Sequence, residues 1–118
     1  MIDGFFKLTA KQRKYYFAVV VPIVLAHYEK NQGEFLMDLA NVIKADTTLE
    51  FVHEFLKMWF NNGRSTSKLN IPSHQYLEML TAEFAKRGVD IPAPNEISVE
   101  TLGELYRQYE ERNNREKF

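Results

Sequence analysis

Hydrophobic residues recur along most of the chain at the three- and four-residue spacing of amphipathic helices. The first such segment follows Thr9, which can cap a helix, and Gln12 stands three residues later at the reciprocal position of a capping box. This helix is predicted to cover 10–30. Its middle is apolar on nearly all sides, which indicates a central helix covered by others. Pro22 lacks a backbone donor, so we expect a kink or a break there. A strand that enters Pro22 through Ala-Val-Val-Val at 18–21 is the alternative.

Two more helices are expected in the middle of the chain. Apolar residues at helical spacing predict one over 33–46 (GEFLMDLANVIKAD). The next is predicted to begin at 47, since Thr47 and Glu50 form a second capping-box pair. It should end at 61–64 (NNGR), where Asn or Gly can take the left-handed cap conformation. Its apolar stripe, predicted to face the core, consists of Val52, Phe55, Leu56 and Trp59.

The last third of the chain predicts a loop, two helices and an extended strap. The loop over 65–72 ends at a proline, which disfavours helical angles in the residue before it. A fourth helix is predicted over 73–88, and the proline-rich stretch 89–96 (VDIPAPNE) should form the strap. A last helix is expected from Ser98, followed by a fraying polar end. The fourth helix is predicted to bury Leu77, Leu80 and Phe84, and the last helix carries Val99, Leu102, Tyr106 and Tyr109 on one side.

These elements predict a mainly α fold. We expect one compact domain over 1–118, with about five helices, a proline-containing strap and loosely ordered ends at 1–7 and 113–118. A hydrophobic content of 45% and sixteen aromatic residues can build its core. The absence of cysteine excludes disulfides and thiolate metal sites. The longest uncharged stretch, 15–28, has fourteen residues, whereas a membrane span needs about 20. We therefore expect a soluble, cytoplasmic protein that does not cross a membrane.

The charges are unevenly distributed although the formal net charge is only −1. The stretch 55–77 contains three basic residues and no acid, and Lys7, Lys11, Arg13 and Lys14 face only one acid within the first 28 residues. The stretch 90–111, by contrast, carries six acidic residues against Arg107. A partner that contains phosphate would therefore bind the first or the third quarter of the chain.

The pattern HEFLK at 53–57 invites comparison with the zinc-binding H-E-x-x-H helix. Lys57 occupies the place of the second histidine, and a cation there would repel the metal, so we expect no metal site. No nucleophile elbow, phosphate-binding lysine loop or dinucleotide fingerprint is present. We therefore expect neither an enzyme nor a cofactor. His53 is then either exposed or bonded to a neighbouring hydroxyl, or it donates to a phosphate together with Lys57.

Four short motifs occur in a suggestive order: KQRKYYFAVVVPIV, VHEFLKMWF, STSKL and GVDIPAPNE. Together they resemble the phage recombination proteins of the NinB (Orf) type, over about residues 8–96. The family has Gln-Asn-Arg where this chain has Gln12-Arg13. The resemblance implies a phage or prophage protein that works in a bacterial host cell. It would bind single-stranded DNA as a homodimer and assist homologous recombination, with a recombination or replication protein as a further partner.

The candidate contact residues come from two sources. The resemblance implies Gln12, Arg13, His53, Lys57, Ser65 and Thr66, and the basic stretches add Lys11, Lys14, Arg64 and Lys68. Base stacking would need exposed aromatic rings, but Tyr15, Tyr16 and Trp59 stand at core positions of their helices. The alternative function is a small helical adaptor without nucleic-acid binding, whose acidic last helix would contact a host or phage protein.

Overall fold

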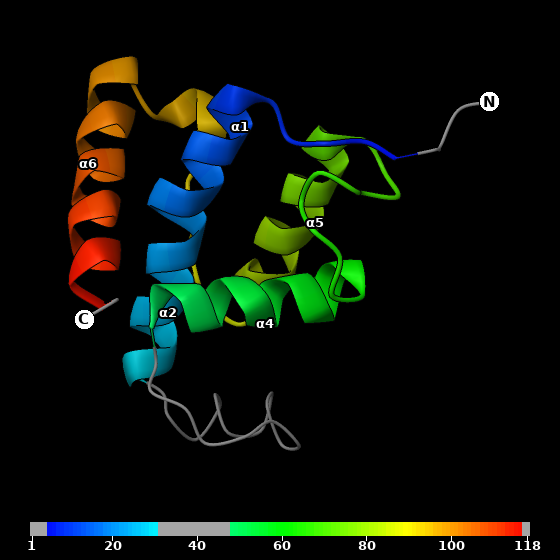
Figure 1. Cartoon of the computed structure of the whole chain (residues 1–118), viewed down its shortest axis with the longest axis horizontal. Coiled ribbons are helices and arrows are strands. Elements are labelled where there is room, and N and C mark those ends of the chain that lie inside the picture. Colours follow the sequence, from blue (N-terminus) through cyan, green and yellow to red (C-terminus); the bar gives the residue numbers. More distant parts are fainter. Residues whose placement is uncertain (1–4, 31–47, 117–118) are drawn as a thin grey trace.

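A computed structural model describes residues 5–30 and 48–116 (Figure 1). The first helix begins with α1 (Ala10–Tyr15), where both halves of the predicted capping box form. Thr9 Oγ1 accepts a hydrogen bond from the Gln12 backbone N–H at 3.1 Å, and Gln12 Oε1 accepts one from the Thr9 N–H at 2.9 Å. The predicted start of this helix is confirmed, because the two residues satisfy each other's exposed backbone donors.

The chain stays helical through Pro22, by way of a widened turn. The π-helical segment η1 (Tyr16–Val20) follows α1, and α2 (Val21–Lys30) continues from it. The Val21 N–H bonds to the carbonyl of Tyr16, five residues back. Proline removes one N–H and crowds the carbonyl four residues before it, and the π turn directly before Pro22 accommodates this defect. Of the expected kink or break, the break is therefore wrong, and the alternative strand is wrong as well.

The N-cap of the next described helix, α4 (Leu49–Asn61), lies one residue later than its capping-box pattern predicts. Thr48 is the cap, with its Oγ1 accepting from the Phe51 N–H at 3.1 Å. Leu49, the first residue of this helix, lies in the core at 1% exposure. Thr47 and the predicted helix over 33–46 lie outside the described residues.

The remaining helices follow the predicted order. As predicted, α4 ends in a left-handed turn, with φ of 53° at Asn62 and 79° at Gly63. The predicted fourth helix is α5 (Ser73–Ala85), and the strap contains one 3-10 turn, η2 (Pro94–Glu96). The last helix, α6 (Val99–Glu116), continues further into the polar end than expected.

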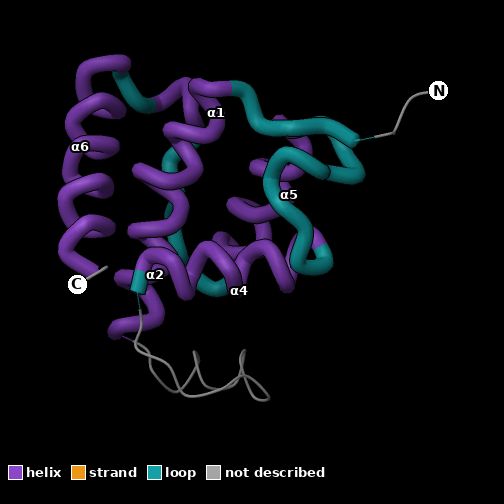
Figure 2. Tube along the Cα trace, in the orientation of Figure 1, coloured by secondary structure: helices purple, strands orange, loops and turns teal. Residues whose placement is uncertain are grey.

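The central position of the first helix is confirmed. In Figure 1, α6 lies beside it on one flank, α4 crosses below, and α5 stands on the opposite flank. Figure 2 shows only helices and loops along the described chain, so the mainly α fold is confirmed. The largest fully buried side chains of these helices come from the first helix, α4 and α5: Tyr15, Tyr16, Tyr28, Tyr76, Phe84, Leu25, Leu49, Leu56 and Leu80.

Trp59, predicted to face the core, and Val99, on the apolar side of the last helix, both reach solvent. Trp59 is 38% exposed. Its ring packs edge-on against Phe84, and the guanidinium of Arg87 lies 4.6 Å from the ring centroid. Val99 is 75% exposed, because it occupies the first position of α6, before the helix reaches the core at Leu102. Among the described helices, none is both long enough and apolar enough to span a bilayer.

Candidate functional site

The N-terminal segment pairs with the loop that follows α4. Phe6 and Leu69 exchange two backbone hydrogen bonds of 2.8 Å in an antiparallel bridge. The Leu8 N–H donates to the carbonyl of Thr66 at 3.4 Å. This pairing fixes the start of α1 against the loop, although about sixty residues of chain separate them.

A shallow cleft of about 380 Å³ lies at this junction. It brings one predicted residue of the first helix, Arg13, together with one of the loop, Thr66. Its lining consists of Lys7, Leu8, Thr9, Ala10, Arg13, Thr66 and Ser67. None of these residues is acidic, and Lys7 and Arg13 are both exposed. The two basic segments that the sequence singles out therefore meet at one place through these residues.

The loop around the cleft is organised by Asn61, which is only 4% exposed. Its Nδ2 donates to the carbonyl oxygens of Arg64 and Ser65, each at 3.0 Å, and more weakly to that of Lys68 at 3.4 Å. One amide thereby satisfies three carbonyls of a loop that has no regular structure of its own. No local pattern predicts this role, because an asparagine at the end of a helix is typical of a cap.

Some polar residues of the loop bond within the loop, and others carry charge. Ser65 Oγ lies 3.0 Å from Ser67 Oγ and accepts the Ser67 N–H, and Thr66 is 5% exposed. Arg64 and Lys68 are exposed. The Arg64 guanidinium donates to Asn70 Oδ1 at 3.1 Å and lies 5.5 Å from the centroid of the Phe5 ring. Arg64 and Lys68 are therefore the residues of the predicted loop set that present charge to solvent.

His53 lies on α4 and faces the first helix. Its Nδ1 lies 2.8 Å from the hydroxyl of Tyr16, and its ring centroid is 4.8 Å from that of Phe17. Burial lowers the pKa of His53 to about 4, and the nearby positive charge of Lys57 adds to this effect. The ring is therefore neutral at pH 7, so His53 cannot act as a cation toward phosphate. The predicted bond to a neighbouring hydroxyl is confirmed.

Lys57 is less available than its position on the polar face suggests. Its side chain is 17% exposed, and its Nζ lies 2.7 Å from a carboxylate oxygen of Glu54. This ion pair neutralises much of its charge toward any other partner. Lys57 precedes the loop in the sequence, but it contributes little charge to the surface around the cleft.

The remaining predicted residues of the first helix point elsewhere. The side chain of Gln12 is used in the capping box, and the residue borders a different cleft with Tyr15 and His74. The Nζ of Lys14 lies 5.5 Å from the centroid of the Tyr106 ring, on the α6 side. Lys11 is exposed, but it does not line the cleft that Arg13 shares with the loop. Of the segment 11–14, the structure brings only Arg13 to the loop.

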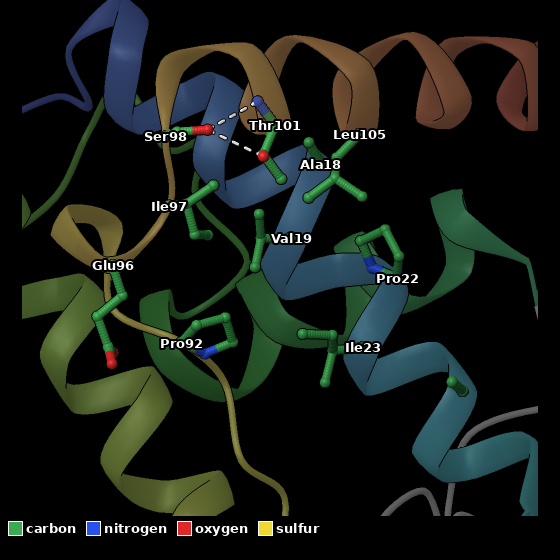
Figure 3. Close-up of a pocket in the computed structure, with 11 residues that line it drawn as sticks. Ala18, Val19, Pro22, Ile23, Pro92, Glu96, Ile97, Ser98, Thr101 and Leu105 are labelled. Atoms are coloured by element: carbon green, nitrogen blue, oxygen red, sulfur yellow. Dashed lines mark hydrogen bonds between the residues drawn. The ribbon is translucent and has the colours of Figure 1, made fainter.

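A second, apolar cleft of about 430 Å³ lies between α2, the strap and α6 (Figure 3). Val19, Pro22 and Ile23 point into it from the helix, and Pro92 and Ile97 from the strap. Ser98 Oγ closes one end by bonding to the N–H and the hydroxyl of Thr101. The lining offers few polar groups, so it suits an apolar side chain better than a charged ligand.

The aromatic residues expected in the core are not the ones that reach solvent beside the basic loop. Tyr15 and Tyr16 are core residues at 1% and 0% exposure, whereas Phe5 and Phe6 are 38% and 45% exposed. No local pattern singles out Phe5 and Phe6, since their place beside the loop depends on the pairing with Leu69. Within the described ranges, no three His, Asp or Glu side chains converge as metal ligands would.

The chain was compared with family models, curated proteins and solved structures, and none of them matches it.

Proposed function

We propose that this chain binds single-stranded DNA on a surface formed by Lys7, Arg13, Arg64 and Lys68, which we call the basic surface. The observation that carries the proposal is the pairing of Phe6 with Leu69, because it unites cations from distant parts of the chain. All four side chains are exposed. Exposed basic side chains make the sequence-independent contacts to a nucleic-acid backbone.

The local chemistry of the cleft supports the same partner. The lining has two cations, no carboxylate, and the hydroxyl-bearing residues Thr9, Thr66 and Ser67. Hydroxyls and backbone N–H groups complement lysine and arginine in binding phosphate oxygens. The net charge of −1 means that this attraction is local, so we expect binding of modest affinity and strong salt dependence.

An exposed aromatic ring beside a cation favours a single strand over a duplex. Phe5 is 38% exposed and lies against the Arg64 guanidinium. Unpaired bases can stack on such a ring, whereas the bases of a duplex are stacked on each other. Phe5 therefore supplies the stacking partner that Tyr15 and Tyr16, both buried, cannot supply.

The resemblance to NinB-type recombination proteins supports a recombination accessory. Residues from three of its motifs lie close together in the fold: Arg13 and Tyr16 from the first, His53 from the second and Thr66 from the third. On this proposal the chain is a phage or prophage protein that works in a bacterial cytoplasm. It assists recombination as a homodimer and contacts a recombination or replication protein.

A salt titration tests the proposal. A fluorescent oligothymidine is titrated with the protein at several salt concentrations, and the logarithm of the affinity is plotted against that of the salt concentration. Each phosphate neutralised on a single strand contributes roughly 0.7 to the slope, so four cations predict a slope of about −3. Failure to bind the oligonucleotide at about 50 mM salt would rule out the proposed function.

Matched variants locate the surface. Arg13→Ala with Arg64→Ala should reduce the steepness of the slope by about 1.4, because two phosphate contacts are lost. Lys86→Ala is the control, since Lys86 is an exposed cation of α5 that pairs with Glu83. An equal loss of affinity in the control would show that binding follows overall charge and not this surface.

The apolar cleft supports an adaptor as the second candidate function. Its lining from Val19, Pro22, Ile23 and Ile97 could accept a hydrophobic side chain of a partner protein. Acidic residues of α6, such as Glu100 and Glu104, would then contact basic groups around it. This function predicts no oligonucleotide binding at low salt, so the same titration separates the two candidates.

A further inference from the structure

The hydrogen bond between Tyr16 and His53 joins the core to the edge of the candidate site. Tyr16 is completely buried, whereas His53 is half-buried between Phe17 and the polar face of α4. The phenol oxygen and Nδ1 are 2.8 Å apart, and the two rings meet edge to face at 5.4 Å. One nitrogen of the imidazole is therefore held by the core.

The hydrogen-bond partners of the buried Tyr16 hydroxyl determine which imidazole nitrogen of His53 carries the proton. Among the described residues, Nδ1 of His53 is the only partner within hydrogen-bonding distance of the Tyr16 hydroxyl. If Nδ1 carried the imidazole proton, the O–H of Tyr16 would be buried without an acceptor, which costs free energy. The favoured arrangement therefore has the Tyr16 O–H donating to an unprotonated Nδ1.

The titration behaviour of both groups agrees with this arrangement. Burial raises the pKa of Tyr16 well above its usual value, so the phenol keeps its proton. Burial and the charges of Lys57 and Arg13 lower the pKa of His53 to about 4, although Glu54 opposes them. A neutral imidazole with a bare Nδ1 carries its single proton on Nε2.

The Nε2–H is therefore an oriented donor, and Arg13 lies near enough to the ring for its charge to help lower the pKa of His53. Within the part of the chain that the structure describes, no residue accepts a hydrogen bond from it. The Arg13 guanidinium lies 5.4 Å from the centroid of the Phe17 ring, which in turn packs against His53 at 4.8 Å. Arg13 also lines the cleft, so a strand bound there would pass near this row of residues.

We propose that His53 is a neutral phosphate-binding residue, whose Nε2–H donates to a phosphate oxygen beside Arg13, and that Tyr16 is the positioning residue that fixes this tautomer. The proposal rests on the proposed binding of single-stranded DNA and adds a contact of a different kind. Lys7, Arg13, Arg64 and Lys68 act through charge and release counterions. His53 acts through a directional hydrogen bond without charge, so its loss should leave the salt dependence unchanged.

Two substitutions of His53 separate its two nitrogens. In His53→Gln, the side-chain amide extends to about the position of Nε2 and retains a donor there. In His53→Asn, the shorter amide can still accept from Tyr16 but lacks the distal donor. We expect His53→Asn to bind an oligothymidine about tenfold more weakly, with an unchanged salt slope, and His53→Gln to stay within about threefold of the parent chain.

Tyr16→Phe tests the positioning role. It removes the donor to Nδ1 and leaves the ring in place, so we expect this variant to bind an oligothymidine more weakly. Adding His53→Gln should restore the affinity, because an amide has no tautomer to fix. If the melting temperature falls but affinity measured well below it does not, Tyr16 has only a structural role. Equal losses in His53→Gln and His53→Asn would overturn the phosphate contact.

Nitrogen chemical shifts of the imidazole give a readout that does not depend on the variants. In the unmodified chain, we expect a protonated Nε2 and an unprotonated Nδ1 at pH 7, and a shift of the Nε2 resonance when an oligothymidine is added. A protonated Nδ1, or an Nε2 resonance unaffected by a strand that binds, would overturn the inference while leaving the proposed function intact. No binding at all by the unmodified chain would overturn both.

Discussion

The carboxylate of Glu116 accepts a hydrogen bond of 2.8 Å from the backbone N–H of Leu49. The last described residue of α6 thereby caps the first residue of α4, in addition to the local cap from Thr48. A carboxylate here satisfies a backbone N–H that has no partner within the helix, and it also interacts favourably with the positive end of the helix dipole. Arg112 holds the same carboxylate from the preceding turn, with its Nε at 2.9 Å.

We expect Glu116→Ala to lower the free energy of unfolding by about 1 kcal/mol, because an N–H at the helix start loses its partner. Urea denaturation followed by circular dichroism measures this change. Glu110→Ala is the matched control, since Glu110 is exposed on the same helix. If both variants lose the same stability, the effect comes from α6 itself and not from the contact with Leu49.

Asn61 should be essential for the shape of the loop. Asn61→Ala leaves the carbonyls of Arg64 and Ser65 without their donor, which predicts a loss of about 1–3 kcal/mol. Hydrogen exchange across 64–69 should become faster in this variant. In Asn62→Gly, by contrast, the left-handed φ of 53° suits glycine, so stability should change by less than about 1 kcal/mol. Similar losses in both variants would contradict the role of the Asn61 amide.

Two buried tyrosines should respond oppositely to loss of their hydroxyls. The Tyr76 hydroxyl is buried with no hydrogen-bond partner among the described residues, so Tyr76→Phe should leave the melting temperature unchanged or raise it. The Tyr15 hydroxyl donates to the carbonyl of Pro92 at 2.6 Å and ties the first helix to the strap. Tyr15→Phe should therefore cost about 1 kcal/mol. A greater loss in Tyr76→Phe than in Tyr15→Phe would refute this assignment.

Acidification should destabilise the fold through His53. Its pKa falls from about 6.5 in the unfolded chain to about 4 in the folded one, so the unfolded state binds more protons between these values. Stability from this group is complete above about pH 6.5 and is lost as the pH falls toward 4, by roughly 3 kcal/mol at most.

Denaturation curves between pH 4 and 7 measure this dependence. His53→Gln should flatten the profile, because the amide does not titrate, whereas the same substitution at the exposed His74 is the control. A profile in His53→Gln as steep as in the unmodified chain would assign the dependence to other groups.

The cations near the loop should differ in their effect on DNA binding. Lys57→Ala should change affinity little, because Glu54 already pairs with its ammonium group. Arg64→Ala should weaken binding and reduce the steepness of the salt slope by about 0.7, since Arg64 is exposed. Parallel salt titrations of the two variants measure the difference. A larger change in slope for Lys57→Ala would show that its ion pair opens to bind phosphate.

Local patterns account for most of the fold. The capping box of Thr9 and Gln12, the left-handed stop at Asn62, and the apolar spacing of Val52, Phe55 and Leu56 are properties of a few neighbouring residues, and the structure confirms each. Predictions failed where short- and long-range effects compete. Pro22 does not end its helix, since a π turn and the surrounding core compensate for the missing donor.

The candidate site depends mainly on tertiary structure. The order of residues alone predicts which segments are basic and which helices are amphipathic, because charge and periodicity are local properties of the chain. Only the fold decided that Phe6 pairs with Leu69, that Arg13 joins the loop while Lys14 turns to Tyr106, and that Tyr16 reaches His53. Contacts between residues dozens of positions apart are set by how the helices pack, and no local pattern encodes that packing.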